Sequence, residues 1–155
     1  MPLLTAILLA FASALLFWIF LGRVIDRMVR ANRQEREGVD LMFRRLTDAI
    51  MVHEDTSPSV IEAVRAVSLS AVSNGRNKDI LEAALIAETQ NPSGEILDEF
   101  NRDQAAAVSQ AVEGAVTALA ARSRRRWAPH QRALAKDPEL GARAAIRAGR
   151  AGAGR

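Results

Sequence analysis

Apolar residues along the chain form one long uninterrupted run, followed by shorter sets that recur with a regular spacing. The long run covers residues 3–21, which are nineteen residues without a charged side chain. An α-helix rises by about 1.5 Å per residue, so this run would span roughly 28 Å, close to the hydrocarbon thickness of a bilayer. The pattern predicts a transmembrane helix over residues 3–21.

The position of this run favours a membrane anchor over a cleaved signal peptide. A signal peptide carries a basic segment before its apolar stretch and a small-residue cleavage site after it. Only Met1 and Pro2 precede the run, and the one small-residue pattern of this kind, Ala12-Ser13-Ala14, lies inside it. We therefore expect an uncleaved signal anchor.

The charges beside the run predict its orientation. Residues 22–36 contain five arginines, and no basic side chain precedes the run. Arginines near a membrane segment are retained on the cytoplasmic side. We expect a single-pass protein of the cell inner (plasma) membrane, with its N-terminus outside, residues 22–36 as a basic juxtamembrane helix, and residues 23–155 in the cytoplasm.

Beyond the membrane run, apolar residues recur every three or four positions, which is the spacing of α-helices. The first helix should continue to about His53, with Gly38 as a candidate break or bend. A second helix should begin at Ser57 or at Ser59. Pro58 after a Ser57 cap fits the first helical position, whereas Ser59 with Glu62 fits a capping box. Two further helical patterns follow, the last of them ending near residue 121.

No segment alternates apolar and polar residues as a half-buried strand does, so the sequence predicts an all-α protein. Residues 37–121 carry six basic and fourteen acidic side chains and should form a small acidic helical bundle. Phe43 and Phe100 are the only aromatic residues of that region, so we expect a thin, aliphatic core. Domains this small are marginal alone, which favours cover by a partner or by self-association.

Residues 122–155 have the opposite charge, with ten basic and two acidic side chains. Beyond Trp127, prolines, glycines and arginines leave little apolar surface to bury. Segments of this composition cannot offset the entropy lost on folding. We expect a disordered basic tail rich in alanine, glycine and arginine.

The composition gives no support for catalysis. The chain has no cysteine, which excludes thiolate catalysis and cysteine-ligated metal or iron–sulfur centres. No glycine-rich phosphate-binding motif and no nucleophile motif occur, and the two histidines, His53 and His130, lie in different regions. We expect no catalytic, cofactor or metal site and no small-molecule substrate, and therefore a protein that is not an enzyme.

Two sets of residues are candidates for binding partners. Small residues spaced by four let another membrane helix approach closely, and a polybasic segment beside an aromatic residue attracts anionic headgroups or nucleic acid. The helix-packing set is Ala6, Ala10, Ala14 and Gly22. The set for polyanion or lipid binding is Arg122, Arg124, Arg125, Arg126 and Trp127.

These features favour interaction over chemistry. We expect a membrane-anchored, non-enzymatic accessory or assembly subunit of a larger membrane protein complex. Its partners would be the lipid bilayer and other membrane subunits or a second copy of the chain. The alternative is a membrane tether that holds nucleic acid or anionic lipid through the basic C-terminal tail, in a phage or chromosome context.

Overall fold

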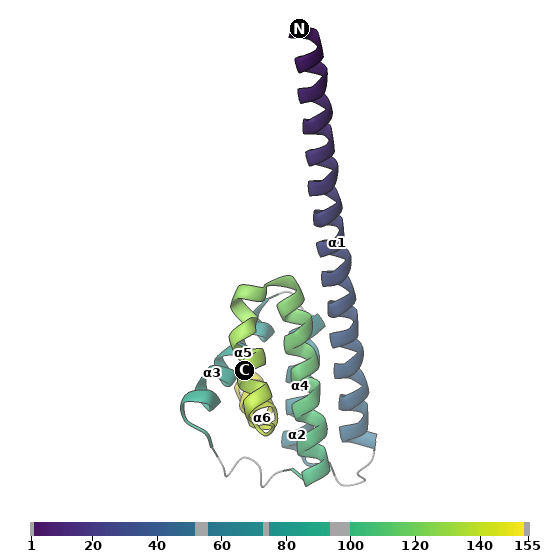
Figure 1. Cartoon of the computed structure of the whole chain (residues 1–155). Helices are drawn as coiled ribbons and strands as arrows, with labels where there is room; N and C mark the ends of the chain where they lie inside the picture. The colour runs from purple at the N-terminus through teal and green to yellow at the C-terminus, as the bar shows by residue number, and fades with distance from the viewer. Residues whose placement is uncertain (1, 52–55, 73–74, 94–99, 154–155) are drawn as a thin grey trace. The chain divides into compact units, whose positions relative to one another are not determined.

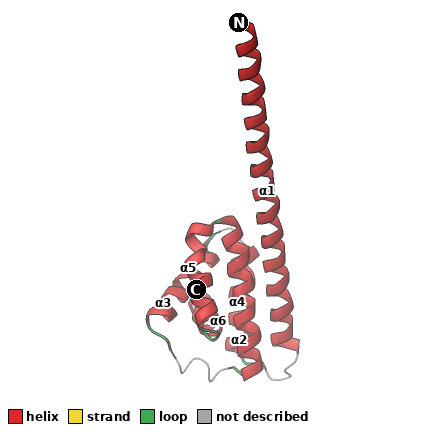
Figure 2. Cartoon of the chain, viewed as in Figure 1, coloured by secondary structure: helices red, strands yellow, loops and turns green. Residues whose placement is uncertain are grey.

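The computed structural model describes residues 2–51, 56–72, 75–93 and 100–153, with side chains from Ser13 onward, and this part of the chain contains helices and no strand (Figure 1, Figure 2). The all-α prediction is therefore confirmed. The helices are α1 (Pro2–Met51), α2 (Pro58–Val72), α3 (Arg76–Gln90), α4 (Arg102–Arg122), α5 (Arg124–Lys136) and α6 (Leu140–Ala153).

The long helix α1 follows the sequence pattern closely. Pro2 occupies its first helical position, where the missing N–H costs no hydrogen bond. The structure describes this helix as far as Met51, and the predicted end at His53 lies outside the described residues. The expected break or bend at Gly38 is wrong, because α1 runs through this glycine without interruption and Gly38 is buried.

The chain divides into two compact units, residues 1–33 and residues 34–155. In the first unit, consecutive large apolar side chains of α1 are exposed. Over the described residues, no helix combines the length and the apolar character that crossing a bilayer requires, so the described residues do not support the transmembrane helix predicted over residues 3–21. The side chains of residues 3–12 lie outside the described part. The exposed apolar residues are Leu15, Leu16, Phe17, Trp18, Ile19, Phe20 and Leu21.

The centre of the second unit is α6, the yellow helix of Figure 1, which packs against α2, α3 and α4. Every residue from 140 to 149 except Arg147 is buried. The prediction of a disordered tail beyond about Trp127 is therefore wrong for the described residues up to Ala153. The described part of that region is helical, and α6 forms part of the core.

Small residues explain how a helix with so little apolar surface becomes central. A Cβ atom added at Gly141 would lie 2.8 Å from the Cα atom of Ser109 on α4, and one added at Gly149 would lie 2.8 Å from the backbone nitrogen of Ala63 on α2. Real Cβ atoms do not approach other atoms this closely. The two glycines therefore let α6 pack directly against the backbones of α4 and α2.

The core also contains an aromatic residue that the expected thin, aliphatic bundle lacked. Trp127 on α5 is 1% exposed and is the largest fully buried side chain. Burial of an aromatic ring of this size contributes more apolar area than any other single residue of the core. Its large buried neighbours in the same cluster are Met42, Leu81, Leu85, Leu140 and Ile146.

A side-chain cap joins the start of α4 to the end of α1. Asn101 accepts a hydrogen bond from the backbone N–H of Asp103 at 3.3 Å, and Gln104 accepts one from the backbone N–H of Asn101 at 3.2 Å, which is a capping box. The amide nitrogen of Gln104 also donates to the carbonyl oxygen of Ala49 at 3.3 Å. The first turn of α4 is thereby fixed against the last turn of α1.

Candidate interaction surfaces

The polybasic segment picked out by the sequence forms the corner between α4 and α5, where Ser123 is the single linking residue. Arg122 donates to the carboxylate of Glu35 on α1, with nitrogen–oxygen distances of 2.9 and 2.5 Å. This hydrogen bond and the charge of Arg122 hold the pKa of Glu35 below its ordinary value. The ion pair therefore connects the α4–α5 corner to the part of α1 with which the second unit begins.

Arg126 ties the same corner to α3. Its guanidinium donates to Asp79 at 2.5 Å and, through Nε, to Glu82 at 2.8 Å. The hydrogen bond from Arg126 lowers the pKa of Glu82 more than burial raises it, and the two carboxylates raise the pKa of Arg126. Arg126 is an internal partner of acidic residues, so its charge is largely neutralised within the bundle.

Trp127 is not available at the surface. Its ring is buried, with the Arg126 guanidinium 5.7 Å and the His130 ring 5.6 Å from its centroid. A tryptophan that inserts between lipid headgroups or stacks on a base must be exposed. Within this fold Trp127 anchors α5 to the core and does not take the surface role that the sequence suggested.

Two arginines of the predicted set remain at the surface without a partner. Arg124 and Arg125 are exposed, and the described part of the chain gives neither of them an ion pair. Arg36, next to Glu35 on α1, is likewise exposed and unpaired among the described residues. We refer to Arg36, Arg124 and Arg125 as the basic corner.

Further basic residues of the C-terminal region pair with a buried carboxylate. Glu88 on α3 is fully buried and accepts hydrogen bonds from the Ser93 hydroxyl at 2.6 Å and the Ser93 N–H at 3.0 Å. Arg147 approaches it at 2.7 Å and Arg143 at 3.5 Å. Burial raises the pKa of Glu88, but Ser93 and Arg147 outweigh it, and the net pKa is lowered. The sequence analysis missed this cluster, although the matched acidic and basic regions were a signal for it.

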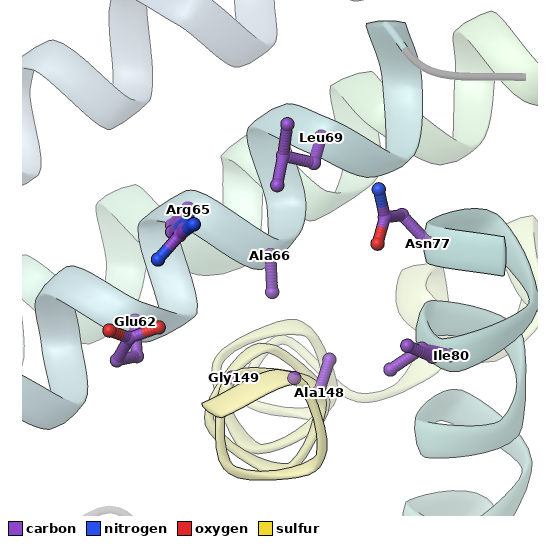
Figure 3. Close-up of a pocket in the computed structure, with 9 residues that line it drawn as sticks. Glu62, Arg65, Ala66, Leu69, Asn77, Ile80, Ala148 and Gly149 are labelled. Carbon is purple, nitrogen blue, oxygen red and sulfur yellow. The ribbon is translucent and has the colours of Figure 1, made fainter. Parts of the chain in front are cut away.

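A small pocket lies between α2, α3 and α6 (Figure 3). Its volume is about 180 Å³, below the range of roughly 300–1,000 Å³ of most small-molecule sites. Figure 3 shows Glu62 and Arg65 on α2 beside Ala148 and Gly149 on α6. The space exists because α6 carries no larger side chain there, and we interpret it as a consequence of small-residue packing.

Larger depressions border α1 and α4. One of about 660 Å³ lies along α4 and the α5–α6 link and includes Phe100, Leu134 and Pro138. Another of about 580 Å³ surrounds Phe43 on α1, which is 46% exposed. Ile50 lies seven residues from Phe43, on the same helix face, and is also exposed. The second unit thus leaves an apolar stripe of α1 uncovered.

The predicted helix-packing residues fall only partly in the described region. The side chains of Ala6 and Ala10 lie outside it. Ala14 is exposed, and a Cβ atom added at Gly22 would meet no described atom within 4 Å. The structure therefore brings no described helix against Ala14 or Gly22, and both are open to a partner.

The described residues contain no group of three or more histidine, aspartate and glutamate side chains that could hold a metal ion. The candidate surfaces are thus the basic corner and the uncovered apolar stripe of α1. Comparison of the chain with protein-family models, curated proteins and solved structures found no match.

Proposed function

We propose that this chain is a single-pass, membrane-anchored, non-enzymatic accessory or assembly subunit of a larger membrane complex. Residues 3–21 form the anchor in this proposal, with the N-terminus outside and the helical bundle in the cytoplasm. The anchor is supported by the nineteen-residue run without charge, by the arginines that follow it, and by the exposure of its described apolar side chains, such as Trp18.

The observation that carries the accessory role is the uncovered apolar stripe of α1 in the second unit. Phe43 and Ile50 lie on one helix face, and each keeps 40% or more of its surface exposed. Exposed aromatic and aliphatic side chains that share a face are typical of protein interaction sites. A partner helix that covered Phe43 and Ile50 would remove this apolar surface from water.

Site-specific photo-crosslinking tests the accessory role. A photoreactive amino acid at Phe43 should yield a discrete crosslinked product in intact cells, and the same product should co-purify after mild detergent extraction. Arg65 on α2 is the control, because it is exposed and does not line the depression around Phe43. Equal products from both positions, or none from Phe43, would contradict the proposal.

The alternative proposal, a nucleic-acid tether through the whole basic tail, has less support. Such a tether needs many arginines free to contact phosphates, because each contact contributes only a modest part of the affinity. Arg122, Arg126, Arg143 and Arg147 instead pair with acidic residues of the same chain. A tether would still retain DNA on the purified protein in a salt-dependent manner, which is its test.

A further inference from the structure

We propose that the basic corner, Arg36, Arg124 and Arg125, binds the phosphate groups of anionic lipids in the membrane that carries the anchor. The inference rests on the proposed membrane anchor and adds a lipid site to it. The three arginines are exposed and lack an ion pair in the described part of the chain. Guanidinium groups without an internal partner suit phosphate, which they can bind through two parallel hydrogen bonds.

The position of the corner in the fold is the first argument. The second unit begins at Gln34, and the Arg122–Glu35 ion pair holds the α4–α5 corner beside this end of the unit. Residues 22–33 join this end to the charge-free run. Even fully extended, these twelve residues span at most about 40 Å. An anchored chain therefore keeps Gln34 within this distance of the charge-free run, which limits how far the corner can move from the lipid surface.

The rigidity of the corner is the second argument. Arg122 precedes the two surface arginines and is fixed to Glu35, and Arg126 follows them and is fixed to Asp79 and Glu82. Trp127 is buried one residue later. Arg124 and Arg125 thus lie at the start of α5 between residues that are held on both sides, so binding a headgroup orders little additional backbone.

The small number of free charges decides between lipid and nucleic acid. Three arginines alone give weak attraction to a free polyanion in solution. An anchor, by contrast, tethers the corner to the membrane and so raises the effective concentration of lipid headgroups around it. At a raised concentration, a few weak contacts are enough for binding. Each basic residue near an anionic surface changes the binding constant by about fivefold, so three together change it by roughly a hundredfold.

The test uses the full chain, which has no cysteine, so one introduced cysteine carries the probe. Ser123 lies in the corner and makes no capping hydrogen bond, so Ser123→Cys with a nitroxide label perturbs little. The protein is reconstituted into neutral phosphatidylcholine vesicles or into vesicles that also contain phosphatidylglycerol. Collisions of the label with a neutral, water-soluble nickel chelate are then measured.

We expect the label to be shielded from the chelate in the anionic vesicles and exposed in the neutral ones. Shielding should disappear at about 0.5 M salt, where charges are screened within a few ångströms. It should also disappear in the triple variant Arg36→Gln, Arg124→Gln, Arg125→Gln. The matched control Arg44→Gln, Arg65→Gln, Arg102→Gln removes the same charge from exposed positions outside the corner and should keep the shielding.

Equal shielding in both vesicle types, or shielding that survives the triple variant, would overturn the proposal. Protection by duplex DNA where anionic vesicles give none would assign the corner to nucleic acid instead. Failure of the chain to float with neutral vesicles would contradict the anchor alone. In that case, lipid binding by the corner is measured as flotation of the chain with anionic vesicles at low salt. The triple variant should abolish this flotation.

Discussion

Gly38 of α1 and Gly114 of α4 meet backbone to backbone. A Cβ atom added at Gly38 would lie 2.6 Å from the carbonyl oxygen of Gly114, and one added at Gly114 would lie 2.7 Å from the carbonyl oxygen of Gly38. Both contacts are shorter than any that a side chain tolerates. The pair of glycines sets how closely α1 packs on α4, and with it the position of the apolar stripe of α1.

We predict that Gly38→Ala and Gly114→Ala each lower the free energy of unfolding by about 1–3 kcal/mol, because overpacking forces backbones apart. The loss should appear although alanine has the higher helix propensity, by about 1 kcal/mol. Gly152→Ala is the control, since its Cβ meets no described atom within 4 Å and should leave stability unchanged or slightly raised. Urea unfolding followed by Trp127 fluorescence, in a Trp18→Phe background, measures all three. An unchanged free energy of unfolding in Gly38→Ala and Gly114→Ala would contradict the close contact between the backbones of α1 and α4.

The buried carboxylate of Glu88 should contribute far more to the free energy of unfolding than the exposed carboxylate of Glu139, although both lie near Arg143. Glu88 is fully buried, whereas the Glu139 side chain is 64% exposed at 3.5 Å from Arg143. We predict that Glu88→Gln lowers the free energy of unfolding by about 1–3 kcal/mol, because it removes the charge from a buried group that accepts two hydrogen bonds from Ser93 and pairs with Arg147, whereas Arg143 keeps its ion pair with Asp137. Glu139→Gln should change it by less than about 0.5 kcal/mol. Similar effects of the two substitutions in urea unfolding would refute this assignment.

Acid should destabilise the bundle through its paired carboxylates. The pKa values of Glu35, Glu82 and Glu88 are all lowered from 4.5. The unfolded chain then binds more protons than the folded one as the pH falls, so the free energy of unfolding decreases with falling pH. We predict constant stability near neutral pH and a progressive loss as the pH falls below about 4.5 through the lowered pKa values. Stability that stays level through this range would show that the three pairs do not form in solution.

Sequence patterns predicted the helices whose boundaries depend on local chemistry. Pro58 after Ser57 was one of two predicted starts of α2 and is the observed one, and the Val60 N–H donates to the Ser57 carbonyl oxygen at 3.0 Å, as a helix start requires. The apolar period also predicted a helix through the described residues up to Met51. Such features depend on neighbours within a few positions, so they can be found without knowledge of the fold.

The burial of α6 could not be found in the same way. Hydropathy patterns measure apolar area, and α6 is buried through small residues such as Gly141 and Gly149 that permit close backbone contact. Its arginines are compatible with burial because Glu88 lies opposite them on α3. These relationships join residues more than thirty positions apart, and composition alone suggested disorder instead.

The candidate site was found in part for the same reason. The sequence grouped Arg122, Arg124, Arg125 and Arg126 as one basic segment. The fold separates them by partner, since Arg122 pairs with Glu35 across 87 positions and Arg126 with Glu82 across 44. The two arginines without such partners are the ones left for an external ligand, and only the tertiary structure distinguishes them.

The orientation of the anchor can be tested with one introduced cysteine. Ser93 pairs with Glu88 and should be left intact, whereas Ala151 is exposed near the end of α6. We predict that Ala151→Cys is labelled by a membrane-impermeant thiol reagent only after cell lysis, because the proposed topology, based on the arginines after the charge-free run, has the bundle in the cytoplasm. Labelling of intact cells would reverse the proposed topology.

The placement of residues 140–153 at the centre of the bundle underlies both the paired arginines and the fixed basic corner. Amide hydrogen exchange of the full chain, read by mass spectrometry, measures it directly, because buried helices exchange only through local or global unfolding. We predict that peptides from α6 exchange as slowly as those from α4 and far more slowly than an unstructured peptide of the same sequence. Exchange of residues 140–149 at the rate of an unstructured peptide would contradict the fold and the surfaces derived from it.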